Sequence, residues 1–229
     1  MTAIRLETPT ARTLVLDAPE LGSAVAGQHI DIRLTAEDGY TAQRSYSLAS
    51  ATGARPVEVT VERFEDGEVS PYLVEDVGVG DPLEIRGPIG GWFVWGPEQE
   101  EPVQLIAGGS GIVPLMGMIR THAAVGSPAP FRLLYGVQDP DRRYYRDELD
   151  RLAGAGLQLD IRYSRRAPDG LPVGRIGAAE LAALTLPPEQ RPTVYVCGPT
   201  GFVEAVADGL LRLGHAPERI RTERFGPTG

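Results

Sequence analysis

Residues 43–50 concentrate side chains that could hold a phosphorylated aromatic ligand. The stretch alternates like a β-strand, so Arg44 and Tyr46 are expected on one face, with Ser45 and Ser47 on the other. A fixed cation suits a pyrophosphate, an aromatic face suits a flat ring, and a hydroxyl suits a ring nitrogen. The stretch would therefore suit a dinucleotide that carries a flat heterocycle, although an ordinary strand with a polar outer face would show the same alternation.

A second candidate is the segment from Gly67 to Ser70, which precedes a short helical stretch at residues 70–76. Ser70 is predicted as the N-cap and Pro71 as the first helical residue. Because the first N–H groups of a helix have no partner within it, a helix start can bind an anion. A plain capped helix would look the same. Paired with Arg44, however, the segment would supply a second contact to one pyrophosphate.

Three glycine-bearing turns follow strand-like segments in the second half, at residues 108–114, 136–139 and 197–201. Ligands of parallel sheets bind at the carboxyl ends of the strands, where these turns lie. The first turn departs from the dinucleotide fingerprint because Pro114 stands where the third glycine would be. It is not a nucleophile elbow either, since Ile112 stands two residues after Ser110. The absence of that elbow counts against a hydrolase.

The composition excludes several kinds of chemistry. Cys197 is the only cysteine among 229 residues, which excludes an intrachain disulfide, a four-cysteine iron–sulfur cluster and a cysteine-rich zinc site. All 22 basic residues are arginine, so no lysine is present for a Schiff base or a P-loop. No apolar run reaches the roughly 18 residues of a membrane span, and the start lacks a signal-peptide core. We therefore expect a cytoplasmic protein without a membrane span.

Charge is distributed unevenly along the chain. The net charge of −9 argues against a nucleic-acid partner. Residues 1–100 hold 17 acidic residues and 7 arginines, a net −10, whereas residues 101–229 hold 14 and 15, a net +1. Local groups such as Arg44 must therefore hold any phosphate bound by the first part. The second part is the better host for a freely exchanging anionic ligand.

Periodicity divides the chain into residues 1–99 and 100–229. The first part has short, evenly spaced strands separated by turns, which predicts a small antiparallel barrel. The second part alternates strand with helix, which predicts a doubly wound parallel sheet. The expected strands are 12–17, 29–34, 56–62, 82–86, 103–107, 131–136, 157–163 and 193–197, and the expected helices of the second part are 112–124, 145–152, 178–184 and 201–213.

The order of residues 44–47, 67–70, 108–114 and 197–199 resembles the ferredoxin–NADP reductase superfamily, over nearly the whole chain. That family combines a six-stranded antiparallel flavin-binding barrel with a doubly wound α/β domain that binds a pyridine nucleotide. The resemblance implies a flavoprotein oxidoreductase that uses FAD and NAD(P)H, in the two-domain form without an iron–sulfur domain. No metal site is implied. FAD is favoured over FMN by the resemblance alone.

The resemblance also implies roles for individual residues. The flavin pyrophosphate would pair with Arg44 and with the segment of Gly67, Val69 and Ser70. Tyr46 would stack on the isoalloxazine, and Ser47 would lie near flavin N5, with Ser45 beside them. The other implied residues belong to the nucleotide side. Gly109, Gly111 and Pro114 would lie under the nicotinamide ribose and pyrophosphate, and Cys197, Gly198 and Pro199 would lie beside nicotinamide C4. In the terminal strand, Glu223 would be a catalytic residue and Phe225 would shield the ring. For Cys197, an ordinary buried strand end is the alternative.

Ser164, Arg165 and Arg166 follow the third strand expected in the second part, where the adenosine end of the nucleotide should lie. A hydroxyl and two guanidinium groups suit a 2′-phosphate, which favours NADPH over NADH. A solvated basic loop is the alternative.

The electron acceptor is left open by the sequence. Because this chain cannot hold a four-cysteine cluster, the acceptor must be a separate molecule, such as a ferredoxin-like, flavodoxin-like, haem or molybdenum protein. Two alternatives are a reductase of free flavin and an electron-transfer subunit that is active only in a complex.

Overall fold

The computed structural model describes residues 1–226. The chain forms two compact units, one of Met1–Gly96 with Met116–Val125 and the other of Pro97–Leu115 with the chain from Gly126 onwards. Periodicity divides the sequence between residues 99 and 100, and the chain leaves the first unit after Gly96. No sequence pattern indicates that Met116–Val125 belongs with the first unit.

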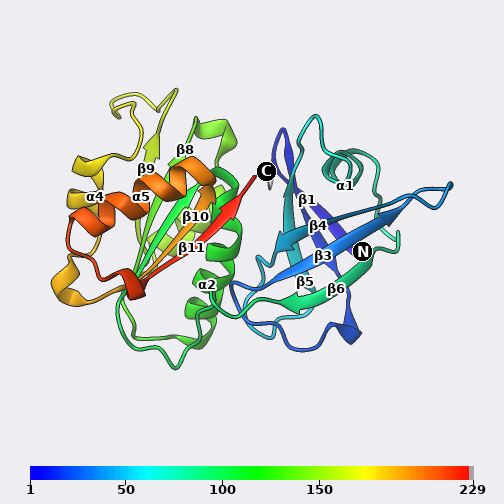
Figure 1. Cartoon of the computed structure of the whole chain (residues 1–229), viewed down its shortest axis with the longest axis horizontal. Coiled ribbons are helices and arrows are strands. Elements are labelled where there is room, and N and C mark those ends of the chain that lie inside the picture. Colours follow the sequence, from blue (N-terminus) through cyan, green and yellow to red (C-terminus); the bar gives the residue numbers. More distant parts are fainter. Residues whose placement is uncertain (227–229) are drawn as a thin grey trace. The chain divides into compact units, whose positions relative to one another are not determined.

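The first unit consists of six antiparallel strands in two three-stranded sheets, ordered β1-β2-β5 and β4-β3-β6 (Figure 1). A bridge between Leu48 and Val59 links the segment after β4 to β5. The elements are β1 (Ala3–Thr8), β2 (Ala11–Leu16), β3 (His29–Thr35), β4 (Thr41–Ser47), β5 (Val57–Glu62), α1 (Ser70–Glu75) and β6 (Glu84–Ile89), with a 3-10 turn at Pro19–Leu21. This arrangement confirms the antiparallel fold predicted for this part.

Apolar side chains from both sheets and from α1 form one core in this unit. It includes Leu14 of β2, Ile32 of β3, Val59 of β5 and Leu73 of α1. The alternation predicted for β3 and β5 places these residues inward, because side chains one residue apart point to opposite faces. The pattern does not reveal β1, an edge strand whose Leu6 is 71% exposed. In such a strand the side chains do not alternate cleanly between core and solvent.

The second unit is a five-stranded parallel sheet with the order β11-β10-β7-β8-β9. It confirms the doubly wound α/β fold. The strands are β7 (Val103–Gly108), β8 (Phe131–Val137), β9 (Gln158–Tyr163), β10 (Thr193–Pro199) and β11 (Ile220–Phe225). The helices are α2 (Ile112–Val125), α3 (Arg146–Ala153), α4 (Ala178–Leu184) and α5 (Thr200–Arg212), with 3-10 turns at Gly109–Gly111, Pro140–Arg142, Pro188–Gln190 and Pro217–Arg219.

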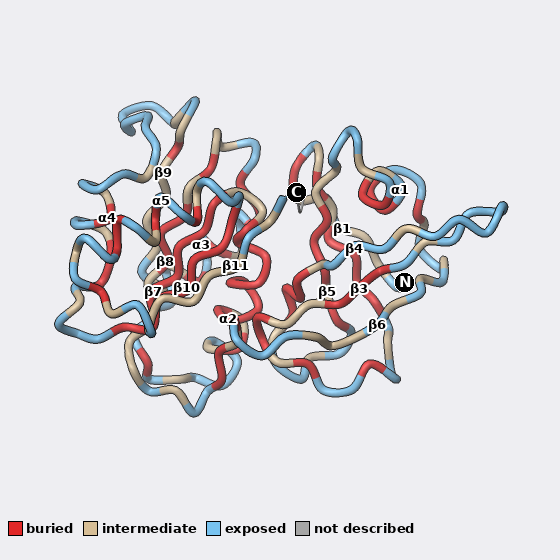
Figure 2. Tube along the Cα trace, viewed as in Figure 1, coloured by how far each residue is buried: buried red, intermediate tan, exposed pale blue. Residues whose placement is uncertain are grey.

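The parallel sheet reverses its direction of winding between β7 and β10. The chain runs from β7 outward to β8 and β9, and then returns to β10 and β11 on the other side of β7. Helices α4 and α5 pack together on one face, which Figure 1 shows in front of the strands. Every residue of β7 is buried, as expected for a central parallel strand covered on both faces (Figure 2). In such sheets a ligand binds at the carboxyl ends of the strands beside this reversal.

Among residues 1–226, no helix has both the length and the apolar character needed to cross a membrane.

Candidate functional site

Strand β4 presents two different faces, as its alternation predicts. Ser45 lies opposite Asp31 of β3, and its hydroxyl donates to Asp31 Oδ1 over 2.6 Å. Gln43 donates to Asp31 Oδ2 over 2.9 Å, so Gln43 and Ser45 share one face. Arg44 and Tyr46 lie on the opposite face. The carboxylate of Asp31 therefore fixes the Ser45 side of the strand through hydrogen bonds.

The guanidinium of Arg44 is exposed but already paired with a carboxylate. Its Nη2 lies 3.0 Å from Glu68 Oε2, with side-chain exposures of 56% and 49%. Its Nη1 also donates to the carbonyl of Gln43 over 2.7 Å. Glu68 accepts a second hydrogen bond from the Tyr40 hydroxyl over 2.7 Å, and this bond raises the pKa of Tyr40. Arg44 is thus held next to the predicted pyrophosphate segment by that segment's own acid.

Tyr46 and Ser47 are less exposed than Arg44. Tyr46 is half-buried and packs against the core of the first unit, and burial raises its pKa while the nearby Arg44 cation opposes the rise. Its phenol therefore stays neutral at physiological pH. Ser47 ends β4 and is 6% exposed. An aromatic ring fixed by packing suits the stacking role predicted for Tyr46.

The segment from Gly67 to Ser70 differs from its prediction in one respect. Helix α1 begins at Ser70 and its N-cap is Val69, so Ser70 is not the N-cap. The Ser70 hydroxyl instead accepts the backbone N–H of Phe64 over 3.1 Å. A Cβ on Gly67 would lie 2.8 Å from this hydroxyl oxygen and 3.1 Å from the Phe64 carbonyl. Glycine at position 67 therefore allows Ser70 to close the loop.

Two of the three glycine turns predicted in the second unit, those at residues 108–114 and 197–201, meet at the reversal point of the sheet. A Cβ on Gly111 would lie 2.2 Å from the Cys197 carbonyl oxygen and 2.6 Å from the Gly198 nitrogen. A Cβ on Gly108 would lie 2.7 Å from the ring of Phe202, and one on Gly198 would lie 3.0 Å from the Gly108 oxygen. Gly111 and Gly198 are required because two backbone turns approach closely, and Gly108 leaves room for the Phe202 ring.

Both turns leave backbone donors without side-chain caps. Gly109 has a φ of 54°, in the left-handed region that favours glycine, and its added Cβ would meet nothing within 4 Å. Pro199 is exposed and is the N-cap of α5, where no side chain caps the first N–H groups. Pro114 is buried near the start of α2. The turn at Gly109 and the start of α5 therefore offer an anion site of the kind found at helix N-termini.

Cys197 lies opposite Glu223 in the parallel pairing of β10 with β11. Its thiol is fully buried, and burial, followed by the charge of Glu223, raises its pKa well above the ordinary value. Burial therefore favours the neutral thiol over the thiolate. Phe225 ends β11 and lies opposite Pro199. The roles predicted for these residues toward the nicotinamide stay predictions.

The adenosine-end residues differ from one another in what they contact. The backbone N–H groups of Ser164 and Arg165 donate to the carbonyls of Val137 and Gln138, both over 2.9 Å. Arg166 is paired with Asp139 and Asp141. Arg165 is exposed and makes no ion pair within residues 1–226. Of the two guanidinium groups predicted here, that of Arg165 is without an ion pair and that of Arg166 is paired with carboxylates.

Arg175 is a candidate phosphate ligand that the sequence analysis missed. Its neighbour Gly174 donates to the Tyr163 carbonyl over 2.9 Å, and Val173 forms a parallel bridge with Tyr163. These bonds return the loop to the carboxyl end of β9, next to Ser164. Arg175 is exposed and makes no ion pair within the part of the chain that the structure describes. Nine residues separate it from Arg165 in the sequence, so no local motif joins the two.

The second half of α2 holds the chain segment that follows Ser47. A Cβ on Gly117 would lie 2.9 Å from the carbonyl oxygens of both Leu48 and Ser50. Thr121 Oγ1 accepts the Thr52 N–H over 2.9 Å. A glycine inside a helical pattern often marks close packing, so Gly117 indicates in the sequence that something packs closely here, but not which segment does so.

Arg120, one helical turn from Gly117, adds charge to this contact. It donates to the Ala49 carbonyl over 2.9 Å and to Glu58 over 2.8 Å. Because both side chains are under 20% exposed, this pair is screened less than a surface pair.

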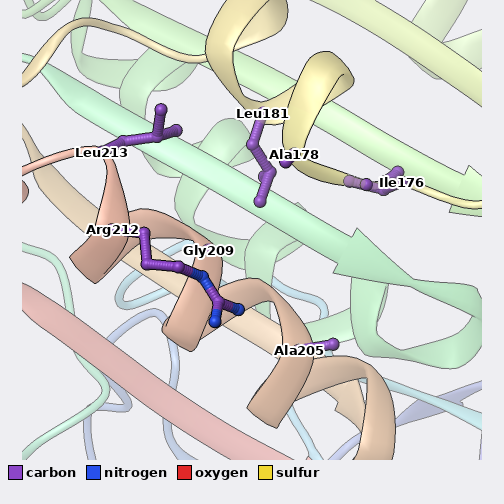
Figure 3. Close-up of a pocket in the computed structure, with 8 residues that line it drawn as sticks. Ile176, Ala178, Leu181, Ala205, Gly209, Arg212 and Leu213 are labelled. Carbon is purple, nitrogen blue, oxygen red and sulfur yellow. The ribbon is translucent and has the colours of Figure 1, made fainter.

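The pocket in Figure 3 lies between α4 and α5 and is separate from these residues. Its volume is about 270 Å³. Its lining includes Ile176, Leu181 and Leu213, and Gly209 leaves room for Leu181, because a Cβ at position 209 would lie 2.5 Å from the Leu181 side chain. None of the predicted ligand residues lines it, so we assign the candidate site to the strand ends and turns.

Comparison with known proteins agrees with this architecture. Residues 6–94 match the model of an oxidoreductase FAD-binding domain, and residues 105–208 match that of an oxidoreductase NAD-binding domain. A flavohemoprotein of Pseudomonas putida is 31% identical over 215 residues, which are 93% of this chain and 54% of that protein. The chain thus spans about half the length of the curated relatives it matches.

Solved structures are similar over both units. The flavohem-like FAD/NAD-binding domain of a nitric oxide dioxygenase from Vibrio cholerae is 31% identical with a TM-score of 0.88, over 98% of this chain and 96% of that one. An Amycolatopsis cytochrome P450 reductase is 27% identical with a TM-score of 0.85, over 100% and 69%. A Neisseria gonorrhoeae ferredoxin–NADP+ reductase shares the fold at 22% identity and a TM-score of 0.84, over 97% and 96%. The chain belongs to the ferredoxin–NADP reductase superfamily and is an FAD-dependent NAD(P)H oxidoreductase.

Proposed function

We propose that this chain is the reductase part of an electron-transfer system, which takes electrons from NADPH through FAD and delivers them to a separate haem protein. The observation that carries the proposal is the similarity, across both units, to the FAD/NAD-binding domain of a nitric oxide dioxygenase. Relatives named flavohemoprotein and cytochrome P450 reductase support a haem acceptor of the globin or oxygenase kind.

The residues of the first unit fit FAD. Arg44 supplies an exposed guanidinium for a pyrophosphate, and Gly67 leaves room beside the Ser70 hydroxyl. Tyr46 would stack on the flavin ring, and Ser47 would orient its polar edge. When bound, FAD accepts a hydride and releases electrons singly or in pairs. The protein's part is to hold the ring in one orientation, which Asp31 supports by fixing the Ser45 face of β4.

The residues of the second unit fit a pyridine dinucleotide. Gly109 and Gly111 would hold the pyrophosphate beside the start of α5, where backbone N–H groups lack side-chain caps. Cys197 and Glu223 would line the nicotinamide end without ionisation of the thiol. Correct alignment of the two ligands would supply much of the rate, because a near-attack geometry removes orientational entropy from the barrier.

The proposed preference for NADPH depends on Arg165, with Arg175 as a second candidate. Both guanidinium groups are exposed and without ion pairs within residues 1–226, so a 2′-phosphate would not have to displace a carboxylate from either. Charge-assisted contacts of this kind are stronger than neutral hydrogen bonds. NADH lacks the 2′-phosphate and would gain nothing from them.

The test begins with the absorbance spectrum of purified protein reconstituted with FAD, followed by steady-state kinetics with NADPH and NADH and ferricyanide as acceptor. We expect a flavin band and a higher kcat/KM for NADPH. Arg165→Ala should lower kcat/KM for NADPH roughly 10-fold or more and that for NADH less than about twofold, since one charge-assisted contact contributes about 1.5–3 kcal/mol. Equal losses for both coenzymes would contradict the 2′-phosphate assignment.

A reductase of free flavin is a second candidate function. The pairing of Arg44 with Glu68 favours it, because this carboxylate would compete with the FAD pyrophosphate for the guanidinium. Retention of flavin on a desalting column separates the two functions. A carrier-coupled reductase should keep its FAD, whereas a free-flavin reductase should lose it and still reduce added flavin with NADPH. A chain that reduces neither flavin nor ferricyanide alone would be an electron-transfer subunit that needs its complex.

A further inference from the structure

The ends of β8 and β9 bring two carboxylates to the proposed 2′-phosphate loop. The strands pair in register up to Val137 and Tyr163. The pairing then continues beyond them, because the N–H groups of Arg165 and Arg166 donate to the Gln138 carbonyl over 2.9 and 3.2 Å. Asp139 directly follows Gln138. The sheet register itself therefore places Asp139 beside Arg166.

Arg166 is held by an acid clamp, which we define as Asp139 and Asp141. Its Nη2 lies 3.6 Å from Asp139 Oδ1 and also donates to Asp141 Oδ2. Asp139 is fixed as well, because it accepts the Asp141 N–H over 2.9 Å and lies 3.6 Å from Arg142. The Asp139 side chain is 19% exposed, against 60% for Arg166. The clamp is thus anchored through Asp139, whereas the side chains of Arg166 and Asp141 are exposed.

We propose that the acid clamp withholds Arg166 from the nucleotide and narrows the preference of this chain for NADPH over NADH. The inference deepens the proposed function and rests on its placement of the adenosine end at this loop. Two carboxylates beside a 2′-phosphate repel it and occupy a cation that could bind it. A ribose 2′-hydroxyl carries no charge and can donate to either carboxylate. Arg165 therefore favours NADPH, whereas the clamp reduces that preference.

The test measures nucleotide binding in the full chain loaded with FAD, with 2′,5′-ADP and 5′-AMP as probes and calorimetry as the readout. The variants are Asp141→Asn and the double variant Asp139→Asn with Asp141→Asn. Asparagine keeps the acceptor for the Asp141 N–H, so the turn should be preserved. We expect the double variant to bind 2′,5′-ADP about 5–10 times more tightly, with 5′-AMP changed less than about twofold, because a released guanidinium gains a charge-assisted contact.

Two controls separate the clamp from a general charge effect. Asp169→Asn removes one exposed carboxylate from the same loop, at a residue that makes no ion pair within residues 1–226. It should leave both affinities within about twofold, since an isolated surface charge is well screened. Arg166→Ala in the double-variant background should abolish the gain, because the gain requires that guanidinium.

The outcomes distinguish this inference from the proposed function. An unchanged 2′,5′-ADP affinity in the double variant, or an equal gain in Asp169→Asn, would overturn the role of the clamp. If Arg165→Ala weakens 2′,5′-ADP in the same experiment, the NADPH assignment stands without the clamp. If Arg165→Ala has no effect while the double variant gains, the clamp is supported and the role of Arg165 is wrong.

Discussion

The two units differ in how they prepare a cation for a phosphate. In the first unit, Arg44 is already paired with Glu68, and the unit holds 15 acidic residues and 8 arginines, a net −7. In the second unit, Arg165 and Arg175 make no ion pair within residues 1–226, and the unit holds 16 acidic residues and 14 arginines, a net −2. An anion that binds Arg44 must compete with a carboxylate, whereas one that binds Arg165 or Arg175 meets an unpaired guanidinium.

This difference fits the different tasks of the two ligands. A cofactor that stays bound can compensate a lost ion pair with many contacts, because an exposed pair is worth only about 0–1 kcal/mol. A nucleotide that enters and leaves in each cycle gains from unpaired cations, which raise its rate of association. If the comparison is right, substitutions in one unit should change one ligand and spare the other.

The largest expected effect is that of Gly111→Ala. The new Cβ would lie 2.2 Å from a backbone oxygen, which cannot move without shifting β10. We expect the second unit to lose about 3 kcal/mol of stability or more, at or above the upper range for overpacking. Binding of NADPH should be lost while FAD stays bound to the first unit, as measured by thermal unfolding and by titration of each ligand.

Gly154→Ala is the matched control for Gly111→Ala. Gly154 is the C-cap of α3 in a right-handed helical conformation, and a Cβ there would lie no closer than 3.5 Å to its neighbours. Alanine should stabilise the second unit by about 0.4–1 kcal/mol, because it fits this conformation and reduces the freedom of the unfolded chain. Loss of FAD from Gly111→Ala, with the control intact, would show that the two units do not bind their ligands independently.

The second largest effect is expected for Arg44→Ala in the first unit. Loss of a charge-assisted contact to the pyrophosphate should raise the Kd for FAD roughly 10- to 100-fold, on the scale of 1.5–3 kcal/mol. Arg33→Ala is the control, because Arg33 forms a similar exposed pair with Glu84 on neighbouring strands. It should change the FAD Kd less than about twofold. Equal weakening in both variants would remove the specific role of Arg44.

Glu68→Gln is expected to change the affinity for FAD in the direction opposite to Arg44→Ala. If Glu68 competes with the pyrophosphate, its neutralisation should tighten FAD about threefold, in keeping with the small free energy of an exposed pair. Fluorescence titration of the apoprotein with FAD measures both variants. Weaker binding in Glu68→Gln would mean that the carboxylate orients Arg44 for the cofactor instead of competing with it.

The sequence could predict the helices and strands far better than the contacts that individual side chains make. The strand at residues 193–197 and the helix at 178–184 follow directly from apolar periodicity, and the structure has them at Thr193–Pro199 and Ala178–Leu184. The pairing of Arg166 was not predictable, because it depends on the register of β8 with β9. The hydroxyl of Ser70 was assigned to a cap because such residues favour that position, and in the structure Phe64 uses it instead.

The sequence also could not show which unit contains the second half of α2. Its sequence is continuous with the glycine turn of the second unit, so periodicity assigns it there, yet Met116–Val125 belongs to the first unit. Tertiary contacts decide this, through Gly117, Arg120 and Thr121. A sequence pattern reports which face of a helix is apolar, and not which core that face joins.

A smaller loss of stability is expected for Thr121→Val, which tests the contact between α2 and Thr52. Valine keeps the β-branched shape but leaves the Thr52 N–H without its acceptor, at a cost of about 1 kcal/mol. Thr185→Val is the control, since Thr185 likewise donates to the carbonyl four residues earlier but accepts no hydrogen bond within residues 1–226. Thermal unfolding with FAD bound should show the larger loss for Thr121→Val. A larger loss for Thr185→Val would contradict the importance of the α2 contact.

The smallest effect is the pH dependence contributed by His215, which lies in the second unit after α5. The side chain is 5% exposed, its Nε2 has no hydrogen-bond partner, and burial lowers its pKa, against the raising effect of Glu189. The unfolded chain therefore binds more protons than the folded one below the ordinary histidine pKa of about 6.5, so stability should fall as the pH drops through that value. His215→Leu should lessen the loss of Tm between about pH 7.5 and pH 5.5 while the FAD Kd stays the same at both pH values. An unchanged loss of Tm in the variant would assign the acid sensitivity to other groups. A changed FAD Kd would show that a substitution in the second unit affects the ligand of the first, so the two units would not bind their ligands independently.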